Sequence, residues 1–215
     1  MDIPVDVVPS VKFLLVVSAR PDDMVFALGG MIRAFADAGS VVQVVSLSDG
    51  QRLGATPGHW IGLSHRIVEA ADDLGVGEFE ILDHGLAELP VTPVSTLARE
   101  VWETVGRADA VLAIDAAGRV RPTQVVAFRT AQRVAKLLDA PLLRWSGTAP
   151  RRRPADAGTI TVEVPRARHR AAFARLVGAA SADRSWVGTA PEPWEYLTVP
   201  VPVGAVAPAS VIKAR

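Results

Sequence analysis

The chain has no cysteine, a single tyrosine, no net charge and no long hydrophobic run. Without cysteine, disulfide bonds, thiolate nucleophiles and thiolate metal ligands are all excluded. Without an uninterrupted apolar stretch of about 18 residues, a membrane-spanning helix is not expected. The amino-terminal residues also lack the basic start and the small-residue cleavage pattern of a signal peptide. These absences predict a cytoplasmic protein with no membrane partner.

Acidic and basic side chains balance, with 23 of each. No overall field therefore favours an anionic membrane or nucleic acid, and we expect no nucleic-acid partner. Hydrophobic residues make up 49% of the 215 residues and the mean hydropathy is +0.25, enough for a well-formed core. We expect a single domain over residues 1–215 and leave a homo-oligomer open. The abundance of Ala, Val and Arg is typical of a GC-rich bacterial genome.

One stretch near the amino terminus joins a buried strand to an amphipathic helix. Residues 13–17 are almost entirely apolar, as in a central strand of a parallel sheet covered on both faces. Helical spacing follows in the apolar residues Leu28, Met31, Ile32 and Phe35. The same alternation continues along the chain, which predicts a three-layer, Rossmann-like α/β fold with a mainly parallel sheet. We expect about five or six strands, with 3-2-1-4-5 as the order of the central ones.

The remaining predicted elements are defined by apolar runs and by helix start and stop signals. Strands are predicted at residues 41–47, 78–82, 110–114, 141–145 and 159–164, and helices at residues 65–74, 94–105, 125–138 and 168–177. Residues 51–63 hold three glycines and a proline and follow a strand, so they are predicted to form a binding loop or flap that carries His59.

A polar segment lies between the first strand and its helix. It consists of Arg20, Pro21, Asp22 and Asp23. Loops at the carboxyl ends of parallel strands line the ligand crevice in open α/β sheets, so this segment is well placed for a site. Ordinary helix initiation explains the same residues, because proline and acidic residues favour the first turn of a helix.

Four segments together carry a family resemblance. In chain order they are Ser18-Ala-Arg-Pro-Asp-Asp-Met with Leu28-Gly-Gly, Leu47-Ser-Asp-Gly, His65-Arg-Ile-Val-Glu-Ala-Ala-Asp-Asp-Leu-Gly-Val, and Gly118-Arg-Val-Arg-Pro-Thr-Gln-Val-Val-Ala. Their order and spacing resemble the LmbE/PIG-L family of zinc-dependent de-N-acetylases and amide hydrolases. Residues 192–197 resemble the late segment of that family, so the similarity spans roughly residues 12–200. The resemblance implies the LmbE/PIG-L-like fold.

The resemblance also implies what is missing from the site. The family pattern Ala-His-Pro-Asp-Asp-Glu supplies two zinc ligands, the His and the second Asp, and a general base, the first Asp; here Arg20 replaces the His and Met24 the Glu. The later pattern His-Pro-Asp-His supplies the third ligand, and here it reads Arg121-Pro-Thr-Gln. Asp23 would then be the sole remaining ligand, whereas catalytic zinc needs about three protein ligands. We therefore expect no metal and no cofactor.

What remains at the site is two arginines that face two carboxylates. We predict that Arg20 and Arg121 lower the pKa values of Asp22 and Asp23 and keep both ionised. One interpretation is an internal salt-bridge patch in a disused cleft. The other is a binding cleft in which Arg20, Arg121 and Arg119 hold a carboxylate or phosphate. The predicted catalytic residues are Asp22, Arg20 and Arg121, and the predicted ligand-binding residues are Asp23, Asp49, His59, Arg66, Glu69, His84, Arg119 and Gln124.

The histidines give no metal signature. None of the four has the spacing of a paired ligand on one helix face. His59 and His84 are the better candidates for chemistry, since both follow predicted strands that end near the crevice.

Three functions stay open. The first is a pseudoenzyme or partner protein with a zinc-free, deacetylase-shaped cleft for a small polar ligand of amino-sugar or amide type, anionic ligands included. The second is a metal-independent enzyme with Asp22 as the base and Arg20 and Arg121 as charge stabilisers. The third is an N-acetyl-sugar deacetylase or amide hydrolase with relocated metal ligands. Whether the protein is an enzyme stays open, and an active form would hydrolyse C–N amide bonds.

Overall fold

The computed structural model describes residues 8–50, 57–116, 121–146, 159–165 and 194–200. The strands in this part of the chain are β1 (Phe13–Ser18), β2 (Val41–Ser48), β3 (Val76–His84), β4 (Ala110–Ile114), β5 (Leu142–Ser146), β6 (Thr159–Pro165) and β7 (Trp194–Pro200). The helices are α1 (Pro21–Phe26), α2 (Gly29–Asp37), α3 (Pro57–Leu74), α4 (Val94–Val105) and α5 (Pro122–Leu137).

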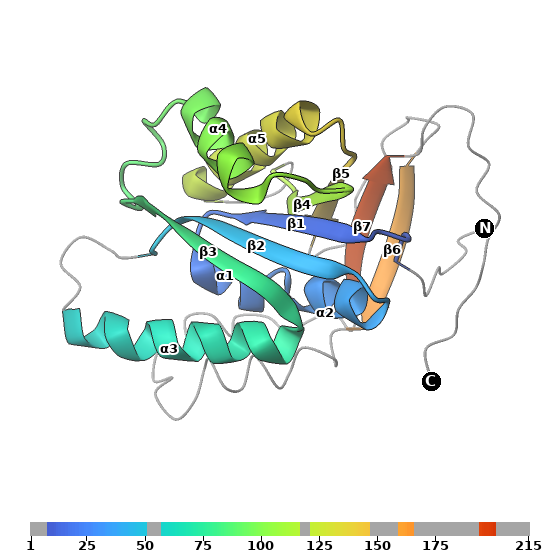
Figure 1. Ribbon diagram of the computed structural model, residues 1–215, viewed down its shortest axis with the longest axis horizontal. Coiled ribbons are helices and arrows are strands. Elements are labelled where there is room, and N and C mark those ends of the chain that lie inside the picture. Colours follow the sequence, from blue (N-terminus) through green and yellow to red (C-terminus); the bar gives the residue numbers. More distant parts are fainter. Residues whose placement is uncertain (1–7, 51–56, 117–120, 147–158, 166–193, 201–215) are drawn as a thin grey trace.

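All seven of these strands form one sheet in the order β3-β2-β1-β4-β5-β7-β6 (Figure 1). The first five pair in parallel, and β7 pairs antiparallel with both β5 and β6. The predicted α/β fold and the central order 3-2-1-4-5 are therefore confirmed. The sheet is one or two strands larger than expected because residues 194–200 form a strand. That segment lies in a proline-rich tail for which the sequence pattern predicts no strand.

Strand β1 lies at the centre of the parallel part, and its two faces belong to two separate cores. Leu14 and Val16 pack with residues of α1, α2 and α3, whereas Leu15 and Val17 pack with residues of α4 and α5. Figure 1 shows α4 and α5 on one face of the sheet and α1, α2 and α3 on the other. Because both faces of β1 are covered, its sequence reads as a continuous apolar run rather than an alternating one.

The structure differs most from the predicted elements in two helical regions. The polypeptide after β1 forms two helices, α1 and α2, because the amides of Ala27 and Leu28 both donate to the Asp23 carbonyl and close the first helix. Helix α3 begins at Pro57 and not near residue 65. Proline is favourable in the first helical turn, so most of the predicted loop at residues 51–63 is helical. Residues 51–56 and the predicted helix at 168–177 lie outside the described residues.

Among the described helices, none is both long enough and apolar enough to cross a membrane.

Candidate functional site

The site predicted from the sequence lies at the point in the sheet where the strand order reverses. Strands β1 and β4 are neighbours, but the chain proceeds from β1 toward β2 and β3 and from β4 toward β5. Ligands of open α/β sheets bind beside the carboxyl ends of strands at such a switch point. We call the end of the sheet at which β1 to β5 terminate the carboxyl edge, and the end at which these strands begin the amino edge. Helix α1 begins directly after β1, and α5 is the helix that follows β4.

The two helices begin with the same local structure. At α1, the Arg20 amide donates to Asp23 Oδ2 at 3.2 Å, and the Asp23 amide donates to the Arg20 carbonyl at 3.2 Å. At α5, the Arg121 amide donates to Gln124 Oε1 at 3.0 Å, and the Gln124 amide donates to the Arg121 carbonyl at 2.9 Å. A proline follows each arginine, where its missing N–H leaves no bond unmade. Each arginine is thus an N-cap residue held by the side chain three residues later.

Side chains also connect the two helix starts to each other. Gln124 Nε2 donates to Asp23 Oδ1 at 3.2 Å, across 101 residues of sequence. Arg20 Nη2 lies 2.6 Å from Asp22 Oδ2, with 13% of each side chain exposed. Asp23 is more deeply buried, at 5% exposure. The structure therefore brings Arg20, Asp22, Asp23 and Gln124 into one cluster, and the charge of Arg121 acts on both carboxylates.

The predicted lowering of the carboxylate pKa values is wrong. Burial raises the pKa of Asp22 above its ordinary value, although Arg20 and Arg121 both lower it. Burial, reinforced by the Asp22 charge, raises the pKa of Asp23 to about 6, against lowering effects of Arg20, Gln124 and Arg121. The free-energy cost of removing these carboxylates from water therefore exceeds the stabilisation that the two guanidinium groups provide. The charges can be read from the sequence, whereas the depth of burial cannot.

Two polar atoms of the Arg20–Asp22 pair make no hydrogen bond in the described part of the chain. They are Asp22 Oδ1 and Arg20 Nε, both of which are buried. An unmade buried hydrogen bond costs free energy, so an additional partner for either atom would be stabilising. The pair therefore offers one acceptor, Asp22 Oδ1, and one donor, Arg20 Nε, to a further hydrogen-bond partner.

The other predicted site residues are spread around the same edge or lie elsewhere. Asp49 is half-buried directly after β2, next to Ser48, whose hydroxyl donates to the Ala19 carbonyl at 2.8 Å and ties the end of β2 to that of β1. Arg66 is half-buried and Glu69 exposed, both on α3. The backbone of His59 is also in α3, which corrects its predicted place in a loop. The side chain of His59 and all of Arg119 lie outside the described residues.

His84 ends β3 and has a partner that sequence reasoning missed. Its Nε2 lies 2.6 Å from Glu100 Oε2 on α4, with 20% and 33% of the two side chains exposed. A second missed pair joins the ends of β4 and β5, where Arg144 Nη2 contacts the two oxygens of Asp115 at 2.9 and 3.0 Å. No local pattern indicates such pairs, because the partners lie 16 and 29 residues apart on different elements.

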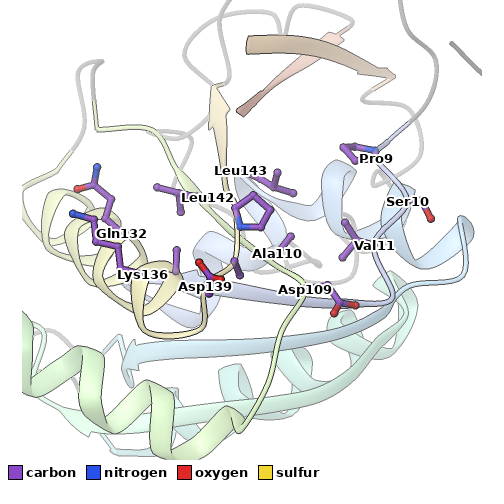
Figure 2. A pocket seen from close by; sticks show the side chains of 13 residues that line it. Pro9, Ser10, Val11, Asp109, Ala110, Gln132, Lys136, Asp139, Leu142 and Leu143 are labelled. Atoms are coloured by element: carbon purple, nitrogen blue, oxygen red, sulfur yellow. The ribbon is translucent and has the colours of Figure 1, made fainter. Parts of the chain in front are cut away.

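A cavity of about 620 Å³ lies at the amino edge, far from these motifs in the fold (Figure 2). It is bounded by the segment before β1, the starts of β4 and β5 and the last turns of α5. Its side chains are mostly apolar, and polar groups stand at its margin, among them Gln132, Lys136 and Asp139. One of its acids, Asp109, already accepts a bond from the Phe13 amide at 2.9 Å. No motif found in the sequence maps to this cavity.

The clustered residues do not fit a zinc ion. Within the described residues, no group of three or more His, Asp or Glu side chains is placed to hold a metal. At the positions that correspond to the family's ligands, Arg20 carries a guanidinium that cannot bind a metal, and Gln124 turns the N–H of its amide toward Asp23. Only Asp23 remains a competent ligand, and one carboxylate does not make a catalytic zinc site.

Comparison with known families agrees with the motifs. The family model described as PIG-L, GlcNAc-PI de-N-acetylase, matches residues 15–134. The chain belongs to the PIG-L family. The expected family is thus confirmed over β1 to α5. A comparison with curated protein sequences gives no match.

Solved structures show that the PIG-L fold extends over most of the chain. GalB, the 4-carboxy-2-hydroxymuconate hydratase of Pseudomonas putida, is 20% identical with a TM-score of 0.63, over 89% of this chain and 97% of that one. A conserved protein of Thermus thermophilus is 21% identical with a TM-score of 0.63, over 92% and 98%. N,N'-diacetylchitobiose deacetylase of Pyrococcus horikoshii is 19% identical with a TM-score of 0.55, over 78% and 69%. These proteins share the fold, and the two whose reactions are named, a hydratase and a deacetylase, differ in chemistry.

Proposed function

We propose that this PIG-L-family protein uses its carboxyl-edge cleft without zinc, to bind a small polar ligand of amino-sugar or amide type, anionic ligands included. In this role it acts as a pseudoenzyme or a partner protein, in the cytoplasm and with small molecules rather than nucleic acid or membrane as its ligands. A homo-oligomer is compatible with this role. The proposal is that the family's fold is retained and its metal-dependent hydrolysis is not.

One observation carries the proposal. Asp23 bonds both the Arg20 amide and the Gln124 side chain, so the three ligand positions lie together. Arg20 and Gln124 contribute hydrogen-bond donors there, where a metal requires lone pairs. The unengaged Asp22 Oδ1 and Arg20 Nε support a ligand with both a donor and an acceptor, as in an amide or an amino sugar. Two arginines beside the cleft support anionic groups on that ligand.

A metal-independent enzyme is the second candidate, with Asp22 as the base and Arg20 and Arg121 as charge stabilisers. The raised pKa of Asp22 favours it, because a general base works best when its pKa lies closer to the working pH. The free Oδ1 atom favours it too, since Oδ2 is engaged by Arg20. Such an enzyme would hydrolyse C–N amide bonds, as the family resemblance implies.

Relocated metal ligands are the third alternative. Among the described side chains no replacement cluster exists, so this alternative depends on histidines such as His59 and His65, whose side chains lie outside that part.

Thermal-shift titration tests the proposal with four probes: glucosamine, N-acetylglucosamine, acetate and inorganic phosphate. We expect at least one probe to raise the thermal midpoint of the wild-type protein in the presence of EDTA, because a ligand that binds only the folded state stabilises it. The shift should be lost in Arg20→Ala and kept in Gln132→Ala, a variant of an exposed residue at the amino edge. Stabilisation that requires added zinc would contradict the proposal, and amide hydrolysis in EDTA would favour the enzyme.

A further inference from the structure

Asp23 and Gln124 form a continuous chain of hydrogen bonds between the starts of α1 and α5. Each side chain binds its own helix with one oxygen, Asp23 Oδ2 to the Arg20 amide and Gln124 Oε1 to the Arg121 amide. Each uses its second atom for the other helix, where Gln124 Nε2 donates to Asp23 Oδ1. The resulting series runs from one N-cap amide to the other without a break.

The two N-cap amides fix which atoms of Asp23 and Gln124 donate and which accept in this series of hydrogen bonds. Both N-cap amides are donors, so each capping side chain must offer an acceptor to its own helix. One of the two remaining atoms must then be a donor and the other an acceptor. A carboxylate opposite a carboxamide meets this requirement, because the amide presents one acceptor and one donor group. Two carboxylates or two amides would place like atoms against each other.

We infer that the Asp23–Gln124 hydrogen bond takes the place of a metal ion as the connection between α1 and α5. In the family resemblance, positions 20, 23 and 124 are the zinc ligands, and a shared metal would join the two helices there. Here Asp23 and Gln124 are joined directly by a hydrogen bond of 3.2 Å. The inference rests on the proposed metal-free cleft and adds what holds that cleft together.

This connection also fixes the arginines. Arg20 and Arg121 are the N-cap residues whose amides end the series, so the bond holds their backbones at a set separation. Both guanidinium charges act on Asp22 and Asp23. The bond therefore sets the separation of the two backbone positions that carry these cations.

Reversing the polarity of the bond tests the inference. At pH 8, where the acidic side chains are ionised, Gln124→Glu sets two carboxylates against each other, and Asp23→Asn sets two donors against each other. The double variant Asp23→Asn/Gln124→Glu restores one donor and one acceptor, keeps an acceptor for each N-cap amide and leaves the net charge of the chain unchanged. We expect Gln124→Glu to lower the thermal midpoint by about 2–8 °C, and the double variant to recover most of that loss. The decisive quantity is the difference between the double variant and the sum of the two single shifts.

A matched control makes the same chemical changes at exposed positions. Asp72→Asn/Gln132→Glu alters one Asp on α3 and another Gln on α5, and its shifts should add. Additive shifts for the Asp23 and Gln124 pair would overturn the inference, as would a double variant that fails to fold while the control folds. A double variant that folds although Gln124→Glu does not would support it.

Midpoints with EDTA and with added zinc separate this inference from the proposed function. A wild-type midpoint that EDTA lowers would contradict the metal-free cleft. Recovery in the double variant is measured in EDTA throughout, so it reports on the bond alone.

Discussion

The two edges of the sheet differ in what they offer a ligand. The amino edge has a cavity of about 620 Å³ with mostly apolar walls and no chemical motif. The carboxyl edge has two capped helix starts, the buried carboxylate of Asp23, and the half-buried carboxylate of Asp22 at 2.6 Å from the Arg20 guanidinium. The cavity lies at the amino edge, whereas the chemical motifs lie at the carboxyl edge. In an open α/β sheet the carboxyl edge is the expected ligand site, because the crevice at a switch point lies outside the carboxyl ends of the strands.

The largest expected effect is on metal binding at the carboxyl edge. Arg20→His with Gln124→His rebuilds the family's ligand set around Asp23, and zinc affinity should rise by several orders of magnitude. Calorimetric titration with zinc measures this gain, and adding Arg121→His and Thr123→Asp is expected to restore trace amide hydrolysis. The same two substitutions to His placed at Gln132 and Arg133, exposed neighbours on α5 whose side chains do not share a helix face, should leave zinc affinity low. A rebuilt variant that folds yet binds no zinc would show that the cleft has changed beyond its ligands.

Burial of the carboxylates predicts an unusual pH dependence. The folded pKa of Asp23, about 6, is above the unfolded value, so the folded state retains a proton that the unfolded state has lost. The contribution of Asp23 to the free energy of unfolding should therefore fall as the pH rises from about 4 to about 6, by about 2–3 kcal/mol, and stay constant above. Asp22 contributes with the same sign, since its pKa is also raised.

Urea unfolding of the wild type and of Asp23→Asn at pH 4, 5, 6 and 7.5 isolates this contribution. The free energy of unfolding of the wild type, minus that of Asp23→Asn, should fall as the pH rises from 4 to about 6. A difference that grows in the wild type's favour would mean that the arginines outweigh burial, as the sequence alone suggested.

The fold was largely predictable and the balance of forces in the site was not. The helix predicted at 94–105 and the strand at 110–114 have the same bounds in the structure, because each has a clean periodicity or a continuous apolar run. Helix α3 was placed too late because Gly58 and Gly62 resemble a loop, although a helix tolerates them after Pro57. The motif positions identified Asp23 and Gln124 as neighbours. Their direct bond and the dominance of burial over charge depend on distances that a sequence does not contain.

Removing Arg20 should cost about 1–3 kcal/mol in the free energy of unfolding, because Asp22 would keep a buried charge without its close partner. Arg20→Lys should recover part of this loss, since lysine restores the charge but not the planar geometry of the guanidinium. Gln132→Ala at the amino edge should change the value by less than about 0.5 kcal/mol. Equal losses at both edges in chemical denaturation would remove the distinction between them.

The smallest effect is expected at the outer part of the carboxyl edge. His84 and Glu100 are partly exposed, so Glu100→Gln should lower the free energy of unfolding by less than about 1 kcal/mol. Glu103→Gln, one turn along α4 and more exposed, is the control. If Glu100→Gln lowered the free energy of unfolding as much as Arg20→Ala, the His84–Glu100 pair would matter for stability as much as the Arg20–Asp22 pair.

Elemental analysis of the purified wild-type protein, paired with its thermal midpoint before and after EDTA, tests the central claim most directly. Arg20 and Gln124 place hydrogen-bond donors at two of the three ligand positions, so we predict zinc far below one ion per chain and an unchanged midpoint. About one zinc ion per chain, together with a midpoint that falls in EDTA, would contradict the account.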